Sequence, residues 1–180
     1  MKVISVNVNP QHGLGKMPCE QIQVLTGLGV EGDAHCGAEV QHGYTREKYP
    51  NLENLRQVHL ISWERLTQLN RLGFDCVPGA LGENITTVGI DLETVPLHTV
   101  LYIGLEVQLL VQGTRRPCKQ VEEFRRGLSK AVWSQHADGT DAWLIGIMCT
   151  VIQGGVISVG NTVCIPQWPP EPHVRLAELK

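Results

Sequence analysis

A cysteine that follows two arginines is the part of this sequence best suited to chemistry. Cys118 ends the run TRRPC (114–118), and further cations follow at Lys119, Arg125 and Arg126, in a chain whose net charge is −3. Positive charge nearby favours the thiolate, which is the form of cysteine that attacks electrophiles and ligates soft metals. The same cations suit an anionic ligand such as a phosphate. The alternative interpretation is a solvated basic turn with an unreactive thiol.

The two arginines before Cys118 are expected to face opposite ways. Residues 105–112 have the apolar character of a strand and lead directly into this run. Successive side chains of a strand point to opposite faces, so at most one of Arg115 and Arg116 is expected to face a pocket.

A second group of candidate residues follows a glycine turn, in the segment GDAHCG (32–37). Three histidines elsewhere are available to complete a metal site or to act as a general base: His12, His42 and His59. His35 and Cys36 are adjacent, and neighbouring side chains of an extended segment diverge, so hydrogen-bonded structural histidines are the favoured interpretation. For Asp33, capping of backbone donors is favoured over the orientation of a nearby cation.

A third candidate is Asn84, which lies between a Pro-Gly turn and a strand-like segment. Its side chain offers donors and an acceptor, and these suit either the recognition of a flat heterocycle or the closing of an irregular turn. His59 alternates with apolar residues in another strand-like segment, which is typical of a hydrogen-bonded, partly buried histidine.

The elements that must position these residues are mostly short strands divided by glycines. Strands are expected at residues 4–8, 21–25, 56–61, 85–88, 100–103, 106–112, 145–153, 156–159 and 162–165. This pattern predicts a mainly β fold, a barrel or sandwich of short strands with a few accessory helices.

Two helices are expected in addition to the strands. The first begins after Ser62 as N-cap and ends at Gly73, with one face formed by Trp63, Leu66, Leu69 and Leu72. The second covers residues 121–132 without a break, despite Gly127.

Length and composition favour a single domain. The chain has 180 residues, 42% of them hydrophobic and 18% charged, which predicts one packed domain over residues 1–165 and a Pro-rich tail over 166–180. Residues 38–55 are irregular and are interpreted as a lid or a substrate-specific loop. With no signal peptide and no apolar span, the expected location is the cytoplasm, without membrane contact. The acidic balance and 5% aromatic content disfavour nucleic-acid binding. The six scattered cysteines are expected to be reduced.

Five groups of segments, in this order, resemble the MOSC domain, the module named after the C-terminal part of molybdenum cofactor sulfurases. They are GVEGDAH (29–35), RQV (56–58) with Ser62 and Glu64, PGALGENIT (78–86) with GIDL (89–92), LYIG (101–104), and RRPC (115–118). The resemblance implies a MOSC-type β-barrel and a pocket that holds a molybdenum-pterin cofactor, the molybdenum cofactor.

The resemblance also implies roles for individual residues. Cys118 matches the family's cysteine, which is a molybdenum ligand or carries sulfur as a persulfide. The arginines and Lys119 would offset the charge of the thiolate and of the pterin phosphate, and Asn84 would bind the polar edge of the pterin. The expected cofactor-binding residues are Arg115, Arg116, Asn84, Asp33, His35 and Lys119.

Three functions follow from the resemblance, and the sequence leaves them open. The first is a molybdenum-dependent reductase of N-hydroxylated or N-oxide compounds with Cys118 as metal ligand. The second is a sulfur carrier in molybdenum cofactor or metal-sulfur cluster assembly, and the third is a cofactor-binding module without turnover. The sequence has no room for the pyridoxal-phosphate domain of the larger sulfurases and no cysteine array for an iron-sulfur domain. A separate sulfur donor or electron-transfer protein is therefore the expected partner.

Overall fold

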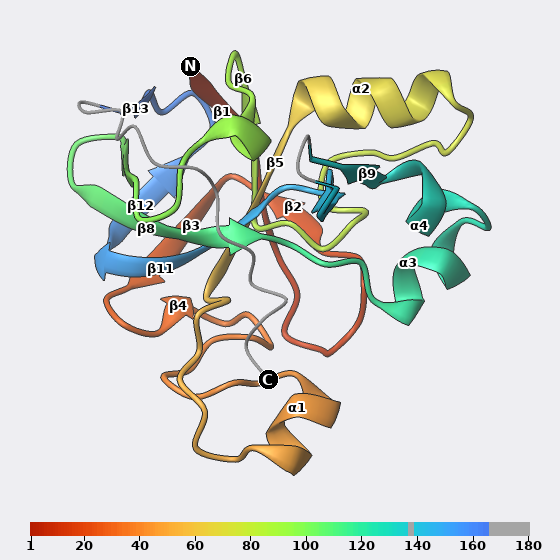
Figure 1. The fold of residues 1–180 in the computed structure, drawn as a ribbon. Helices are drawn as coiled ribbons and strands as arrows, with labels where there is room; N and C mark the ends of the chain where they lie inside the picture. The colour runs from red at the N-terminus through yellow and green to blue at the C-terminus, as the bar shows by residue number, and fades with distance from the viewer. Residues whose placement is uncertain (137–138, 166–180) are drawn as a thin grey trace.

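The computed structural model describes residues 1–136 and 139–165 and shows a mainly β fold with few helices (Figure 1). The largest sheet has eight strands, which in spatial order are β13 (Val163–Cys164), β7 (Val100–Ile103), β8 (Val107–Thr114), β11 (Ile147–Gln153), β5 (Val58–Ser62), β6 (Ile85–Val88), β1 (Lys2–Val8) and β2 (Met17–Cys19). A three-stranded sheet contains β12 (Gly155–Ser158), β3 (Gln21–Leu25) and β4 (Gly29–Val30). A two-stranded sheet contains β9 (Trp133–Gln135) and β10 (Asp141–Trp143).

The large sheet is antiparallel except between β5 and β6, which run parallel. Parallel neighbours need a crossover connection, and here the chain passes through helix α2 (Trp63–Arg71) between them. The order of the sheet ends at β13 and β2 and does not close, so the predicted barrel is not confirmed. An isolated antiparallel bridge joins Lys2 of β1 to Thr162, next to β13.

All nine strands expected from the apolar pattern are present, with small shifts at their ends. The pattern missed the short strands β2, β4, β9 and β10, because two or three residues do not establish an alternation. It also missed helix α1 (Gly43–Lys48), which lies inside the segment 38–55.

Helix α2 begins and ends close to the predicted residues. The Ser62 hydroxyl oxygen accepts a hydrogen bond from the Arg65 N–H at 3.2 Å, which is the N-cap contact expected of serine. The apolar face is narrower than expected, because Leu66 and Leu69 are buried whereas Trp63 and Leu72 are exposed.

The single helix expected over residues 121–132 is wrong. The chain forms α3 (Lys119–Phe124) and α4 (Leu128–Ala131), with a break at Gly127. Gly127 adopts the left-handed conformation (φ 87°), and its N–H donates to Glu122 Oε1 at 2.7 Å. The C-cap of helix α3 is Arg125, whose backbone is extended, and the left-handed Gly127 is the residue directly before α4. Glycine adopts this conformation without steric penalty.

Two hydrophobic cores hold these elements together. The larger lies among the strands and includes Val6, Leu60, Leu109 and Ile147. The smaller lies beneath the helices and contains Ile61, Leu66, Leu69, Cys76, Leu81, Val121, Leu128, Val132 and Ile145. Helices α2, α3 and α4 gather on one side of the molecule, and α1 stands apart at the end of long loops (Figure 1). The smaller core therefore fixes α3, the helix that follows Cys118.

No helix in residues 1–136 and 139–165 is long and apolar enough to cross a membrane. A short 3-10 helix, η1 (Leu92–Thr94), completes the regular structure between β6 and β7. The predicted tail, 166–180, lies outside the residues that the structure describes, and the single domain over 1–165 stays a prediction.

Candidate functional site

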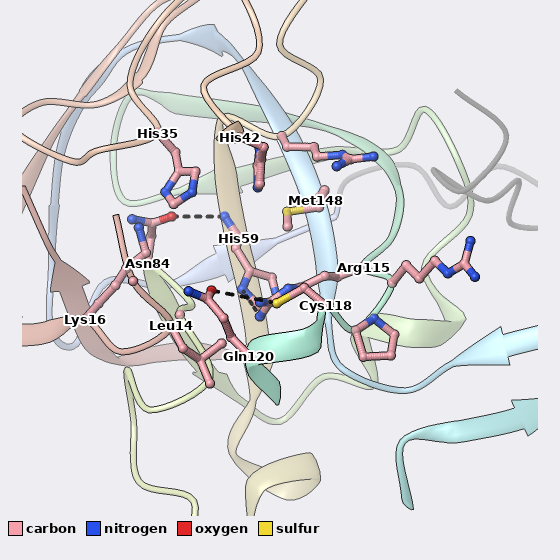
Figure 2. A pocket seen from close by; sticks show the side chains of 15 residues that line it. Leu14, Lys16, His35, His42, His59, Asn84, Arg115, Cys118, Gln120 and Met148 are labelled. Carbon is pink, nitrogen blue, oxygen red and sulfur yellow. Dashed lines mark hydrogen bonds between the residues drawn. The ribbon is translucent and has the colours of Figure 1, made fainter. Parts of the chain in front are cut away.

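A pocket of about 360 Å³ opens beside Cys118 (Figure 2). This volume lies within the range of small-molecule sites, which is about 300 to 1,000 Å³. Its wall comes from distant parts of the sequence: the loop after β1, the loop before α1, strand β5, the loop before β6, and the segment from β8 into α3. Figure 2 shows His35 and His42 across the pocket from Cys118 and Gln120.

Cys118 is held in place by the backbone on both sides of it. The Arg115 N–H donates to the Gly146 carbonyl at 2.9 Å, and the Cys118 carbonyl accepts from the Val121 N–H at 3.0 Å. Val121 is fully buried in the smaller core, so the start of α3 is anchored. These contacts hold the backbone of the segment that carries the thiol beside the pocket.

The thiol of Cys118 is accessible, unlike the thiols in the cores. All six cysteines are free, as expected, and Cys118 is exposed with its Sγ 3.9 Å from Gln120 Oε1. Cys76 and Cys149 are buried, and burial raises the pKa of the Cys76 thiol to about 11. Reactive and metal-binding cysteines need access and the thiolate form, so Cys118 is the pocket's candidate for such chemistry.

The guanidinium group of Arg115 is a fixed cation in the wall of this pocket. Its Nη1 donates to the Leu81 carbonyl oxygen and to His59 Nδ1, the latter at 3.4 Å. Burial lowers the pKa of Arg115, and the nearby Cys118 and Glu83 side chains act in the opposite direction by favouring the charged form. The guanidinium is thus fixed by neutral acceptors and remains available to an anion.

Glu83 is buried next to the pocket and is held by hydrogen bonds of its own. Its side chain is completely buried, and its Oε1 accepts hydrogen bonds from the Gly79 N–H at 2.7 Å and from the Thr86 hydroxyl at 3.2 Å. Burial raises the pKa of Glu83 despite these bonds. The second oxygen, Oε2, has no hydrogen-bond partner among the described residues.

Cations outnumber carboxylates in the pocket wall. Lys16, Arg56, Arg115 and Arg116 line it. In the part of the chain that the structure describes, no carboxylate lies within salt-bridge distance of the three arginines. An excess of fixed positive charge in a partly closed pocket favours an anionic ligand.

Asp33 lies beneath the pocket and organises one wall. One of its oxygens forms a salt bridge with Lys16 Nζ and accepts from Asn84 Nδ2 at 3.1 Å, and the other accepts from the His35 N–H at 3.0 Å. Burial acts to raise the pKa of Asp33, but the hydrogen bonds from His35 and the charge of Lys16 outweigh it and hold the pKa well below its usual range. Asp33 therefore both caps backbone donors and orients a cation.

Asn84 is already committed to the fold. Its Oδ1 accepts from the His59 N–H at 3.2 Å, and its Nδ2 donates to the Asn7 carbonyl at 3.3 Å and to Asp33. The sequence left two roles open for Asn84, recognition of a flat heterocycle and closing of an irregular turn. Asn84 lines the pocket, and its hydrogen bonds support the second role.

Three histidine rings contact one another beside the pocket, His12 and His35 edge to face and His35 and His42 at a tilt. The ring centroids of His35 and His12 are 5.2 Å apart, and those of His35 and His42 are 4.6 Å apart. Burial, together with His35 and two arginines, lowers the pKa of His42 to about 3. Within the described residues, no group of three or more histidine, cysteine, aspartate or glutamate side chains has a geometry that could hold a metal ion. The expectation of hydrogen-bonded structural histidines holds for His59, whose two ring nitrogens have partners, whereas the buried His42 Nδ1 has none among the described residues.

The two arginines before Cys118 differ from the sequence expectation. Arg115 is partly buried and Arg116 is exposed, yet both line the pocket. The expectation that at most one faces a pocket is wrong, because β8 ends at Thr114 and the alternation of a strand ends with it. Lys119 lies outside the pocket wall, where its Nζ pairs with Glu123 at 3.0 Å.

Several pocket residues carried no sequence signal. Lys16 follows a glycine-rich stretch that suggests only a loop, Gln120 directly precedes the predicted helix, and Met148 lies in a strand pattern that suggests packing. Arg56 belongs to the RQV segment, but nothing local indicates that it lines the same pocket as Cys118. These residues meet only through tertiary folding.

The segment 38–55 contributes to the site from one side. It supplies His42 to the pocket wall at the start of α1. Asn54 Nδ2 ties the segment to the carbonyl oxygens of His35 at 3.0 Å and Gly37 at 2.9 Å. Its role as a lid or substrate-specific loop stays a prediction.

Fold and site together define a class: a mainly β protein with a basic pocket that ends at an accessible thiol. The model of the MOSC domain matches residues 32–164, which is most of the chain. The chain belongs to the MOSC domain family.

Solved structures share this fold. The YuaD protein from Bacillus subtilis is similar with 22% identity and a TM-score of 0.72, over 90% of this chain and 93% of that chain. YiiM from Geobacillus stearothermophilus is similar with 21% identity and a TM-score of 0.63, over 92% and 75% of the two chains. YiiM from Escherichia coli is similar with 18% identity and a TM-score of 0.64, over 96% and 73%. No protein of curated function matched the sequence.

Proposed function

We propose that the pocket binds the molybdenum cofactor and that the protein is a reductase of N-hydroxylated or N-oxide compounds. The observation that carries the proposal is the position of Cys118, an exposed thiol at the end of a pocket whose cations outnumber its carboxylates. A thiolate suits a soft metal, and the cations suit the phosphate of a pterin cofactor.

The residues present fit this cofactor in chemistry. Cys118 would hold the metal, and Arg115 with Arg116 would bind the phosphate, since neither arginine has a carboxylate partner in the described chain. When bound, the cofactor would supply two-electron redox chemistry that side chains cannot provide. The stoichiometry of the reaction is R–NHOH + 2 e⁻ + 2 H⁺ → R–NH₂ + H₂O.

His35 is the residue we assign to proton delivery in this proposal. It lines the pocket, and its Nδ1 lies 3.3 Å from Asp33 Oδ1. The carboxylate orients the ring, as in other Asp–His pairs. The second ring nitrogen, Nε2, would then carry the proton that the reduction consumes.

Elemental analysis of protein from a host that makes the cofactor tests the proposal. We expect stoichiometric molybdenum in the wild type, loss of the metal in Cys118→Ala, and retention in Cys164→Ala, which removes another exposed cysteine. Reduction of an N-hydroxylated test compound should follow the metal content. Equal metal content and activity in wild type and Cys118→Ala would overturn the proposal.

The second candidate function, a sulfur carrier, is favoured by the exposure of Cys118 at the molecular surface. In that role a donor persulfide, R–S–S⁻, transfers its outer sulfur to the Cys118 thiolate and leaves as R–S⁻, so that Cys118 becomes the persulfide. The same preparation distinguishes the two, because metal-free protein with one extra, reducible sulfur on Cys118 supports the carrier. Either role would place the protein in the cytoplasm with a separate electron or sulfur donor.

A further inference from the structure

A second hollow lies on the outer side of Cys118. It is an open groove of about 410 Å³ between the start of α3, helix α4 and the β9–β10 sheet. The groove and the pocket share Arg116, Pro117 and Cys118. The segment 116–118 is therefore the wall between them, and the thiol is reachable from both sides.

The groove combines cations with aromatic rings. It is lined by Arg116, Lys119, Lys130, Trp133 and Trp143, and its described lining contains no carboxylate. Lys119 pairs with Glu123 outside this lining, so Arg116 and Lys130 are the groove cations without a carboxylate within salt-bridge distance among the described residues. The Arg116 guanidinium lies 5.8 Å from the centroid of the Trp143 ring, which is cation–π distance. The Trp133 Nε1–H donates to Asp141 Oδ1 at 3.1 Å, which fixes that ring although its side chain is 42% exposed.

This composition is that of a protein-binding surface. Tryptophan and arginine dominate the residues that contribute most to binding at interfaces, and here two of the chain's four tryptophans line one groove with an arginine. An open groove suits a protein surface better than a small molecule, which binds in enclosed pockets. The exposed cations around it, in a chain of net charge −3, favour an acidic partner.

We propose that this groove docks a small acidic electron-transfer protein that delivers electrons to the site through Cys118. The inference rests on the proposed reductase function, because the reaction consumes two electrons that the described chain has no redox group of its own to supply. The donor is oxidised by two electrons for each N–O bond that is cleaved. Interfaces of electron-transfer complexes are small, below about 1,200 Å², so a single groove is a sufficient centre for one.

Lys130→Glu tests the docking with flavodoxin as the acidic donor. Lys130 is exposed, lines the groove and does not line the pocket. We expect the KM for reduced flavodoxin to rise at least threefold at low ionic strength and to depend less on salt, because rim charges control encounter. Turnover with dithionite-reduced methyl viologen, which needs no docking site, should be unchanged. Trp133→Ala should also raise the KM for flavodoxin, through loss of apolar contact.

Lys48→Glu is the matched control, because Lys48 is an exposed cation on α1 that lies outside the groove. Equal KM values for flavodoxin in wild type, Lys130→Glu and Lys48→Glu would overturn the docking site, as would turnover with methyl viologen but none with flavodoxin. A dimer in sedimentation that Lys130→Glu dissociates would assign the groove to a second copy of the chain instead.

Failure of the proposed function gives a different result. Wild-type protein that is inactive with methyl viologen contradicts the reductase, whatever the groove binds. Calorimetric titration with flavodoxin then tests the docking surface independently of the reductase function. Binding that is weakened by Lys130→Glu supports the docking surface, and absence of binding overturns it.

Discussion

Arg115 Nη1 donates to His59 Nδ1 at 3.4 Å, and His59 Nε2 lies 2.9 Å from the Ile145 carbonyl oxygen. Because an arginine only donates, Nδ1 must accept and Nε2 must carry the proton, so His59 is the neutral Nε2–H tautomer. Burial, followed by the charge of Arg115, lowers the pKa of His59 well below its usual value, in agreement with this tautomer. His59 thus positions the guanidinium beside Cys118.

We expect His59→Leu to destabilise the fold more than His59→Gln. Leucine leaves the Ile145 carbonyl and a guanidinium N–H unpartnered, and each buried unpartnered group costs about 1 to 3 kcal/mol. Glutamine retains one donor and one acceptor and can replace part of the pair. Urea denaturation measures the difference, and equal losses in the two variants would show that the hydrogen bonds of His59 do not hold this region together.

The stability of the protein should fall on mild acidification because of His42 and His59. The pKa of His42 is lowered from 6.5 to about 3, and that of His59 is lowered as well. Below pH 6.5 the unfolded state therefore binds protons that the folded state does not. Each histidine makes the free energy of unfolding fall by up to about 1.4 kcal/mol per pH unit across this window.

The raised pKa values of Glu83 and Glu93 act in the opposite direction near the acidic end, so the comparison is between variants. The difference in free energy of unfolding between wild type and His42→Gln should shrink steadily from pH 7 to pH 5. A difference that is constant with pH would contradict the neutral state of His42 in the fold.

Much of the fold could be predicted from the sequence because its signals are local. Alternating apolar residues and glycine turns located every long strand, and Ser62 marked the start of α2. The break between α3 and α4 was missed because residues 121–132 keep a helical apolar spacing, while the break depends on the extended backbone of Arg125 and the left-handed Gly127. The sequence could not predict that the large sheet stays open between β13 and β2, because closure of a sheet into a barrel depends on pairing between strands far apart in the sequence.

The sequence predicted site residues only where they lie together in one motif. Cys118 and the two arginines stand together in the sequence, which marked this segment as the candidate site, but strand alternation wrongly excluded one of Arg115 and Arg116 from the pocket. Lys16 and Met148 come from opposite ends of the chain, and only the packing of β1 and β11 into one fold brings them there. Sequence reasoning placed Lys119 at the cofactor, but the first turn of α3 points it outward.

Arg115→Met should remove most of the affinity of the pocket for small anions. Inorganic phosphate is the probe, and its dissociation constant should rise at least tenfold, because a charge-assisted hydrogen bond contributes about 1.5 to 3 kcal/mol. The free energy of unfolding should change little. Removal of a buried charge stabilises the variant, and this gain opposes the loss of the hydrogen bonds to Leu81 and His59. Arg71→Met, on the exposed end of α2, is the control. Unchanged phosphate binding in Arg115→Met would remove Arg115 from the anion site.

Gly82→Ala should destabilise the protein more than Gly32→Ala. Both glycines have left-handed φ angles, 83° and 74°, so an alanine is strained at either position. Only at Gly82 would the added methyl group lie 2.5 Å from the Leu14 carbonyl oxygen, whereas Gly32 has open space. We expect a difference of about 1 to 3 kcal/mol in the free energy of unfolding, as for overpacked sites. Equal losses would mean that the Leu14 loop moves freely.

The salt bridge between Lys16 and Asp33 should be asymmetric when its partners are removed singly. Both side chains are buried, and Asp33 also accepts from the backbone N–H of His35 and from Asn84. Lys16→Met therefore leaves a carboxylate that still has donors, whereas Asp33→Asn leaves a buried ammonium group whose salt-bridge partner in the described chain is gone. Breaking a buried pair by removal of one partner costs about 3 to 5 kcal/mol, and we expect Asp33→Asn to reach that range and Lys16→Met to stay below it.

The double variant Lys16→Met, Asp33→Asn completes the cycle. Removal of both charges avoids a buried unpaired ion, so the double variant should be more stable than the sum of the single losses predicts, by about 1 to 3 kcal/mol. Urea denaturation of all four proteins at pH 7 gives the coupling energy. Burial lowers the pKa of Lys16, although the charge of Asp33 acts to raise it. In Asp33→Asn the loss in free energy of unfolding should therefore become smaller as the pH rises and the Lys16 amine becomes neutral. Additive losses, independent of pH, would show that Asp33 acts on the site through its backbone contacts and not through its charge.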